Sequence, residues 1–130
     1  MMAFLAALLF LPWNEPTPGI YLDGKATYYG PGVMEQVAAN RDMDLDGAIG
    51  FVALNRAGDL SRLVWLERNG IVAGPYRVAD CAQEGAHYEE RERRGLIVEV
   101  SWEQGQRWKM RGPVPVRVWL IDPREPEGAT

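Results

Sequence analysis

The chain has 130 residues, of which 47% are apolar and 25% are charged, with a formal net charge of −4 and one cysteine. This length and apolar content fit one ordinary globular domain and are too small for two. The acidic balance argues against a nucleic-acid surface, which needs a basic patch, and a single cysteine excludes an internal disulfide framework.

Residues 1–13 (MMAFLAALLFLPW) form an apolar, signal-like segment without a charged side chain. The segment is too short to span a bilayer and has the length of the apolar region of a signal peptide. It lacks a preceding Lys or Arg and a small-x-small cleavage site, so an apolar first strand or helix, or a mis-set start codon, is the alternative. We expect export, with residues 14–23 as a stiff proline-rich linker ahead of the domain.

The first half of the domain alternates β-forming runs with turn signals. The predicted strands of this half are residues 21–29, 50–54, 62–66 and 71–79. Gly30-Pro31-Gly32 closes the first of them, and Asn69-Gly70 predicts a hairpin turn between the last two. The apolar spacing of residues 33–40 predicts a two-turn helix.

The second half continues the same pattern of short elements. Residues 89–94 (EERERR) carry no net charge and are expected to form a solvated helical turn or loop. Residues 96–100 predict a strand, Ser101 opens a capping-box signature ahead of a short helix at 102–110, and alternating valines predict a last strand at 114–121. Six or so short strands with two small helices favour a mainly β barrel over a sandwich or an α/β sheet.

Two carboxyl groups are candidates for proton transfer because apolar residues flank them. Asp80 ends an apolar strand, where burial beside Val78 or repulsion from Glu99 would favour its protonated form. Most aspartates at strand ends only bind turn amides, which is the alternative. Glu99 lies in mid-strand on the same face as Ile97 and Ser101, so exposure to solvent is its default.

Two weaker patterns concern a thiol and a metal. Cys81 and His87 lie six residues apart and could form a nucleophile and its base, although a buried thiol and a histidine in a polar loop are the simpler interpretation. Acidic residues at alternate positions, followed by a turn glycine, are typical of a calcium loop; here they are Asp42, Asp44 and Asp46. The twelfth position would be Ala53, where a glutamate is needed, so a plain acidic turn is the alternative. No other cofactor is expected.

Large aromatic side chains are numerous for a domain of this size. Such rings stack on sugars in glycan-binding clefts, although packing in the core explains most of them more simply. We expect Tyr28 or Tyr29 to line a groove, with Tyr76 and Trp102 as further candidates for substrate binding.

Four segments stand in a particular order along the chain: 24–30 (GKATYYG), 77–81 (RVADC), 97–101 (IVEVS) and 113–118 (PVPVRV). This order resembles the double-psi β-barrel of the rare lipoprotein A, expansin and barwin group. The resemblance implies a mainly β, six-stranded double-psi β-barrel at residues 24–122, with one or two short helices and a C-terminal tail at 123–130. It also implies that Asp80 is the key acid, that Thr27 lies beside it, and that Glu99 takes the place of a second acid.

The same resemblance implies an exported domain directed at a cell-wall glycan, with peptidoglycan as the expected polysaccharide. Asp80 would protonate the glycosidic oxygen while the sugar's own hydroxyl captures the oxocarbenium carbon, as in lytic transglycosylases. The alternatives are a non-catalytic glycan-binding or wall-loosening module and a barrel that is a scaffold for a protein partner. We expect a monomer in the cell envelope or outside the cell, without a membrane span in the mature domain and without a nucleic-acid partner.

Overall fold

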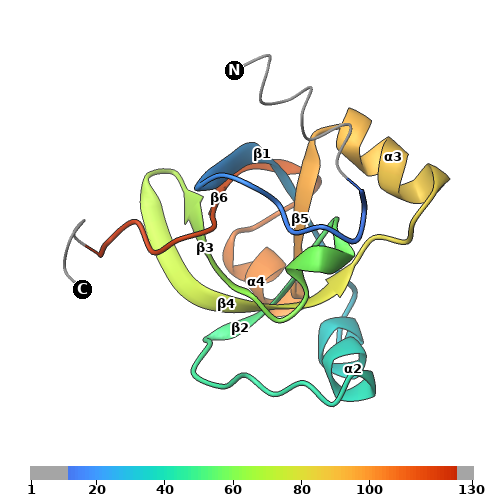
Figure 1. Cartoon of the computed structure of the whole chain (residues 1–130). Coiled ribbons are helices and arrows are strands. Elements are labelled where there is room, and N and C mark those ends of the chain that lie inside the picture. Colours follow the sequence, from blue (N-terminus) through green and yellow to red (C-terminus); the bar gives the residue numbers. More distant parts are fainter. Residues whose placement is uncertain (1–11, 126–130) are drawn as a thin grey trace.

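The computed structural model describes residues 12–125, and six strands of this region close into a mixed β-barrel (Figure 1). The strands are β1 (Tyr21–Tyr28), β2 (Gly50–Leu54), β3 (Leu63–Arg68), β4 (Ile71–Cys81), β5 (Leu96–Val100) and β6 (Val114–Trp119). The helices are α2 (Val33–Asn40), α3 (Ala86–Arg93) and α4 (Trp102–Arg107), with a short 3-10 helix, η1 (Ala57–Asp59). The prediction of a mainly β, six-stranded barrel is confirmed, with three α-helices where one or two were expected.

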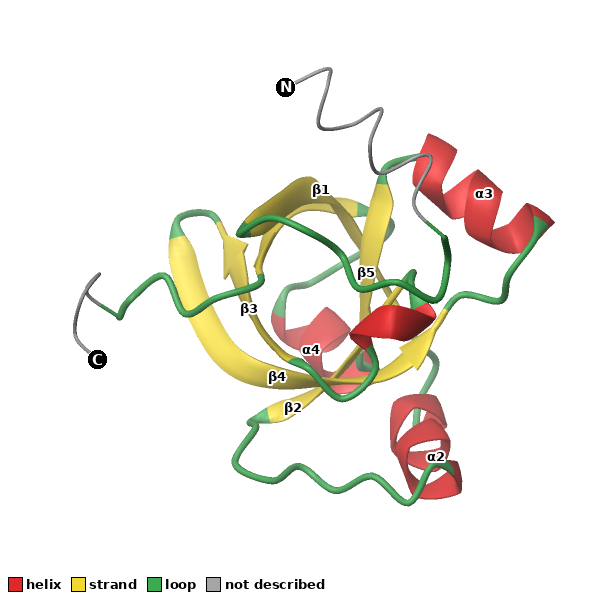
Figure 2. Cartoon of the chain, viewed as in Figure 1, coloured by secondary structure: helices red, strands yellow, loops and turns green. Residues whose placement is uncertain are grey.

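The strand order around the barrel is β1-β5-β2-β4-β3-β6, and β6 pairs back to β1. The pairs β1–β5 and β2–β4 are parallel, and the other four are antiparallel. Figure 2 shows the strands as a ring, with α2 and α3 outside it. The antiparallel pair β2–β5 lies between the two parallel pairs. The four adjacent strands β1, β5, β2 and β4 form the wall that carries the site described below.

Alternation along the strands fills the barrel interior with branched apolar side chains. Val52 of β2, Val78 of β4 and Val98 of β5 are all 0% exposed and belong to one hydrophobic cluster. Burying each such side chain contributes about 1.5–3 kcal/mol to folding. Tyr76 of β4 also lies in this core, and its hydroxyl donates a hydrogen bond to Gln104 of α4 at 2.9 Å. That bond ties α4 to the barrel.

The β3–β4 hairpin forms where the sequence predicts it. Asn69 and Gly70 have φ values of 53° and 79°, the left-handed pair that a type I′ turn requires. The hairpin leads into β4, whose 11 residues pair first with β3 and then with β2. The length of β4 carries its last residues, including Asp80, past β3 to the wall formed with β2.

The predicted linker packs on the barrel, so the domain begins earlier than residue 24. The Trp13 indole donates a hydrogen bond to the Ala82 carbonyl at 2.8 Å, and the Thr17 backbone N–H donates to the buried carboxylate of Asp59 at 2.9 Å. A Cβ at Gly58 would lie 2.2 Å from the Glu15 carbonyl carbon, so only glycine permits this contact. Thr17 and Trp13 thus tie the segment to η1 and to the loop after β4.

Two predicted segments lie partly outside the described residues, namely 1–11 of the signal-like segment and 126–130 of the C-terminal tail. Between these two segments, the structure contains no helix that combines the length and the apolar character needed to cross a membrane.

Candidate functional site

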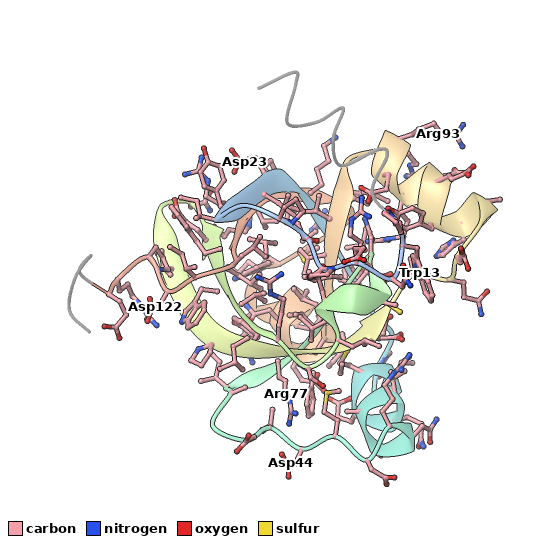
Figure 3. All side chains as sticks on the ribbon, in the orientation of Figure 1. Trp13, Asp23, Asp44, Arg77, Arg93 and Asp122 are labelled. Carbon is pink, nitrogen blue, oxygen red and sulfur yellow. The ribbon has the colours of Figure 1, made fainter. Side chains whose placement is uncertain are left out.

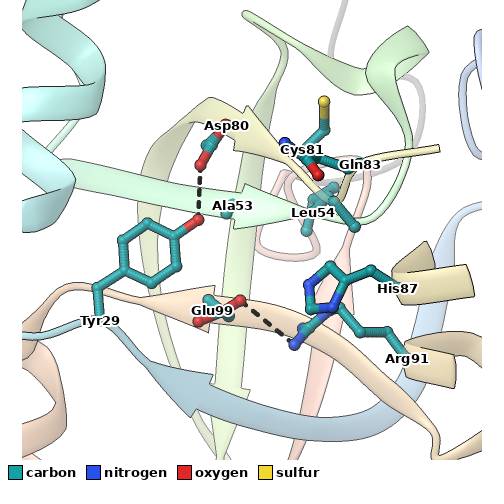
Figure 4. Close-up of a pocket in the computed structure, with 10 residues that line it drawn as sticks. Tyr29, Ala53, Leu54, Asp80, Cys81, Gln83, His87, Arg91 and Glu99 are labelled. Atoms are coloured by element: carbon teal, nitrogen blue, oxygen red, sulfur yellow. Dashed lines mark hydrogen bonds and ion pairs between the residues drawn. The ribbon is translucent and has the colours of Figure 1, made fainter. Parts of the chain in front are cut away.

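A cavity of about 340 Å³ opens on the outer wall of the barrel, where β2, β4 and β5 lie side by side and α3 approaches (Figure 4). We call it the carboxylate cavity. Its lining residues are Tyr29, Ala53, Leu54, Asp80, Cys81, Ala82, Gln83, His87, Arg91 and Glu99. Its volume lies within the range of small-molecule binding sites, roughly 300–1,000 Å³.

Strand register explains why two acids face each other across this cavity. Ala53 of β2 is the register partner of Asp80 on one side and of Glu99 on the other. Two strand spacings separate the backbones of the two acids by about 10 Å. Because the residue between them is an alanine, the space between their side chains stays open.

A bulge in β4 turns Asp80 toward the outside of the barrel. The register with β2 runs from Val52 opposite Val78 to Ala53 opposite Asp80, so β4 contains one extra residue at Ala79. Simple alternation from the buried Val78 would have pointed Asp80 into the core. Bulges of this kind redirect side chains and are frequent next to active sites. The sequence shows no signal for this bulge.

Asp80 receives a hydrogen bond on each oxygen. The Tyr29 hydroxyl donates to Oδ2 at 2.7 Å, and the Arg41 guanidinium donates to Oδ1 at 3.2 Å. The partners are thus two side chains rather than turn amides, and Asp80 lines the cavity as a hydrogen-bond acceptor. Burial and the bond to Asp80 raise the pKa of Tyr29 well above the ordinary phenol range, so Tyr29 remains a donor at neutral pH.

Glu99 is the acid whose protonated form the fold favours. Burial raises the pKa of Glu99, and the nearby Asp80 adds to that rise, whereas Arg91, His87 and Thr27 oppose it. Arg91 pairs with Glu99 at 3.3 Å between Nη1 and Oε1, as Figure 4 shows. The default of solvent exposure is therefore wrong for Glu99, because α3 packs against β5 and covers this part of its outer face.

A buried chain of hydrogen bonds holds Arg91 in place. Its Nε donates to Asn55 Oδ1 at 2.8 Å, and Asn55 Nδ2 donates to the Leu96 carbonyl at 2.7 Å. Arg91 and Asn55 are 7% and 5% exposed. The Arg91 guanidinium that faces Glu99 is therefore held in place by Asn55, which follows β2 and bonds in turn to β5.

Thr27 lies beside Glu99 and not, as the resemblance implies, beside Asp80. It is the register partner of Glu99 across the β1–β5 pair, so Glu99 and Ala53 stand between Thr27 and Asp80. Its hydroxyl oxygen is buried and makes no hydrogen bond to any part of the chain that the structure describes. The hydroxyl is nevertheless near enough to Glu99 to oppose the rise in its pKa.

Of the four aromatic candidates, all of which lie among the described residues, only Tyr29 lines the carboxylate cavity. The neighbouring Tyr28 lies on the opposite face of β1 from Tyr29 and packs on α4. The contact is so close that a Cβ added at Gly105 of α4 would lie 2.9 Å from the Tyr28 ring. Tyr76 is 4% exposed in the core, and Trp102 begins α4. The structure therefore does not bring Tyr28, Tyr76 and Trp102 into this cavity.

The acidic loop before β2 does not gather its aspartates. Asp44 is 88% exposed and pairs with Arg77 at 3.3 Å (Figure 3). Asp42 and Asp46 both adopt left-handed backbone conformations, with φ values of 52° and 44°. Within residues 12–125, no three His, Cys, Asp or Glu side chains are grouped closely enough to hold a metal ion. Calcium binding by this loop, and the plain acidic turn as its alternative, stay predictions.

Helix α3 supplies two cavity residues, His87 and Arg91, and of these the sequence analysis considered only His87, as a possible base for Cys81. The spacing of Cys81 and His87 was a signal for one of them, since both line the cavity. Burial raises the pKa of the Cys81 thiol, and Figure 4 shows its sulfur directed away from the His87 ring. Both observations argue against a thiolate nucleophile with His87 as its base.

Four groups surround the open space of the cavity. Glu99 is an acid with a raised pKa, Asp80 is a second carboxylate that accepts hydrogen bonds, and Tyr29 and Arg91 are anchored donors. Such a cavity can bind a polyhydroxylated ring and transfer a proton to it. Comparison of the chain with protein-family models, with curated proteins and with solved structures gave no match.

Proposed function

We propose that the barrel is a cell-wall glycan-directed domain and that the carboxylate cavity receives one sugar unit of a peptidoglycan strand. The cavity is small and polar, with Asp80 and Glu99 about two strand spacings apart and the Tyr29 phenol between β1 and β4. Carboxylates accept hydrogen bonds from sugar hydroxyls, and the phenol donates. The closed six-stranded mixed barrel agrees with the double-psi resemblance.

The single observation that carries the proposal of cleavage is the raised pKa of Glu99 opposite a second acid. A general acid must hold a proton, and burial shifts the pKa of Glu99 upward, in the direction that favours its protonated form. Asp80, in contrast, accepts a hydrogen bond on each oxygen. We therefore assign the role of proton donor to Glu99 and the role of sugar-hydroxyl acceptor to Asp80, which reverses the roles that the sequence suggests.

The proposed reaction needs no water and no external nucleophile. Glu99 gives its proton to the glycosidic oxygen, and the bond from that oxygen to the anomeric carbon breaks, with its electron pair remaining on the oxygen. A hydroxyl of the same sugar forms the new bond to the anomeric carbon and returns its proton to Glu99. The products are an anhydro-sugar end and a free hydroxyl end, and Arg91 stabilises the Glu99 carboxylate between the two proton transfers.

Incubation of purified peptidoglycan with the full chain tests the proposal directly. We expect anhydromuropeptides in the mass spectrum, and we expect Glu99→Gln to abolish them while the variant still sediments with peptidoglycan. Glu103→Gln is the matched control, because Glu103 is an exposed glutamate on α4 away from the cavity lining. Equal product from wild type and Glu99→Gln would rule out the assigned role.

A second function, binding without cleavage, is favoured by the Asp80 contacts. Arg41 and Tyr29 occupy both Asp80 oxygens, which is a stable arrangement for a carboxylate that only receives hydrogen bonds. Sedimentation with peptidoglycan that is lost in Asp80→Asn, without any anhydro product from wild type, would establish the binding module. Absence of both product and sedimentation would overturn both functions.

Export belongs to the same proposal, because the polymer lies outside the cytoplasm. The apolar composition of residues 1–13 supports it. Cell fractionation and N-terminal sequencing of the mature chain test this part. Recovery of the protein from the cytoplasm with Met1 in place would contradict it.

A further inference from the structure

A second cavity, of about 250 Å³, lies between the β3–β4 hairpin and the C-terminal end of α4. We call it the hairpin cavity. Leu66, Ala73 and Trp108 form an apolar wall, and the charged residues that line it are Arg68, Arg107 and Lys109. Although the chain has a net charge of −4, no acidic residue is among the described residues lining this cavity.

The three cations keep most of their hydrogen-bonding capacity. Arg68 uses one nitrogen to contact the Pro115 carbonyl at 3.3 Å, and Arg107 uses one to contact the Gln104 side chain at 2.7 Å. Neither bond is to a carboxylate, and each guanidinium has five N–H donors. The Lys109 ammonium has no hydrogen bond or ion pair with any residue in the described range 12–125.

The backbone of Lys109 provides an independent observation. α4 ends in a Schellman motif, in which Met110 N donates to the Gly105 carbonyl and Lys109 N to the Gln106 carbonyl, both at 3.0 Å. This motif places Lys109 in the left-handed region, with φ 54°. Glycine is the favoured residue at that position because a Cβ is strained there.

The same chain uses glycine at the equivalent position of another helix. After α3, Gly95 has φ 69° and donates its N–H to the Glu92 carbonyl. After α2, Asp42 takes the same place with φ 52° and donates its N–H to the Ala39 carbonyl. Aspartate adopts this region more readily than lysine, so local structure accounts for Gly95 and Asp42 but not for Lys109. A cation at the C-terminal end of a helix is favourable to the helix dipole, so the experiment must separate that role from ligand binding.

We propose that the hairpin cavity is a second binding site, for a ligand that joins a phosphate group to an apolar ring. Arg68, Arg107 and Lys109 surround the phosphate, and the ring lies against Trp108 and its apolar neighbours. Guanidinium groups match phosphate geometry with paired hydrogen bonds, and an indole offers a flat face for stacking. The proposal does not depend on the proposed function of the carboxylate cavity.

Phenyl phosphate is a suitable probe because it contains only these two groups. We expect saturable changes in the amide NMR signals of Asn69, Trp108 and Lys109 when it is added to the full chain. Inorganic phosphate should bind more weakly, and phenol should give no saturable change. Equal binding of phenyl phosphate and inorganic phosphate would overturn the apolar part of the site, and no saturable change would overturn the whole proposal.

Two substitutions of Lys109 separate ligand binding from a role in the fold. Lys109→Asn keeps a residue that tolerates the left-handed region and should weaken binding about tenfold, the effect of losing one charged hydrogen bond. Lys109→Gly should weaken binding equally while raising the melting temperature, because the strain is removed. Arg111→Gln, which removes an exposed cation outside the cavity, is the control and should leave binding unchanged. Unchanged binding in both Lys109 variants, or a lower melting temperature in Lys109→Gly, would contradict the proposal.

Discussion

The carboxylate cavity has an acid on each of two sides, which we call the β4 wall, with Asp80, and the β5 wall, with Glu99. The partners of the two acids differ. On the β4 wall, Asp80 pairs with Arg41, whose side chain is 39% exposed; on the β5 wall, Glu99 pairs with Arg91, whose side chain is 9% exposed. Both acidic side chains have the same exposed fraction, 21%. The acids therefore differ in what surrounds them rather than in how much of their surface meets solvent.

Position within the sheet explains this difference. Glu99 lies in a strand that pairs on both sides, with β1 and β2, and α3 covers the outer face. Asp80 lies one residue from the end of β4, where the Tyr29 phenol and the exposed guanidinium of Arg41 reach it. Burial by the surrounding strands and α3 thus raises the pKa of Glu99, although its side chain is as exposed as that of Asp80.

The largest expected effect on stability comes from the β5 wall, which carries Glu99. Arg91→Met removes the buried partner of the Glu99 carboxyl group and of Asn55 Oδ1. We expect it to lower the free energy of unfolding by about 3 kcal/mol, the cost of breaking a buried ion pair from one side. Urea denaturation measures this loss. A change below about 1 kcal/mol would show that this pair is no more buried than an ordinary surface pair.

A substitution between the two walls should remove binding without breaking either pair. Ala53→Leu places a larger side chain between Asp80 and Glu99, so we expect sedimentation with peptidoglycan to weaken about tenfold or more. Ala53→Ser, which adds a single oxygen, is the size control and should retain binding. Undiminished binding by folded Ala53→Leu would place the ligand elsewhere.

The pH dependence of stability should reveal the raised pKa of Glu99. A carboxyl group whose pKa is higher in the fold contributes stability that is complete below its unfolded value, near 4.5, and is lost as the pH rises through the folded pKa. Glu99→Gln does not titrate. We therefore expect its melting temperature to rise relative to that of wild type as the pH increases above 4.5, measured by thermal denaturation. A difference between the two proteins that is independent of pH would refute this.

The smallest expected effect on stability comes from the β4 wall, which carries Asp80. Arg41→Met removes an exposed partner, and surface ion pairs contribute less than about 1 kcal/mol to stability. The same urea denaturation used for Arg91→Met should therefore give a curve close to that of wild type. If the two variants lose equal stability, the contrast between the walls is wrong.

The sequence predicts the secondary structure well because the relevant signals are local. The helix at Val33–Asn40 and the strands at Gly50–Leu54 and Leu96–Val100 have the predicted bounds, and Asn69-Gly70 forms the predicted turn. Periodicity, turn residues and caps act over a few residues, so they can be read without knowing the fold. The six-stranded barrel follows from the number and spacing of these elements.

The site depends on features that local patterns do not contain. The bulge at Ala79 reverses the direction of Asp80, and the covering of Glu99 depends on where α3 packs. Alternation alone therefore left Glu99 in solvent, and no local pattern gave a reason to include Arg91. Similarly, the proline-rich composition of residues 14–23 is typical of a linker, but the contact with η1 depends on Gly58, which lies more than thirty positions away.

The state of the Glu99 carboxyl group is the feature on which both the proposed chemistry and the contrast between the walls depend. A carboxyl-carbon NMR titration of the full chain, assigned by comparison with Glu99→Gln, measures its pKa directly. We predict a midpoint above 4.5, the ordinary value for glutamate. A midpoint at or below 4.5 would contradict the assignment of Glu99 as the proton donor.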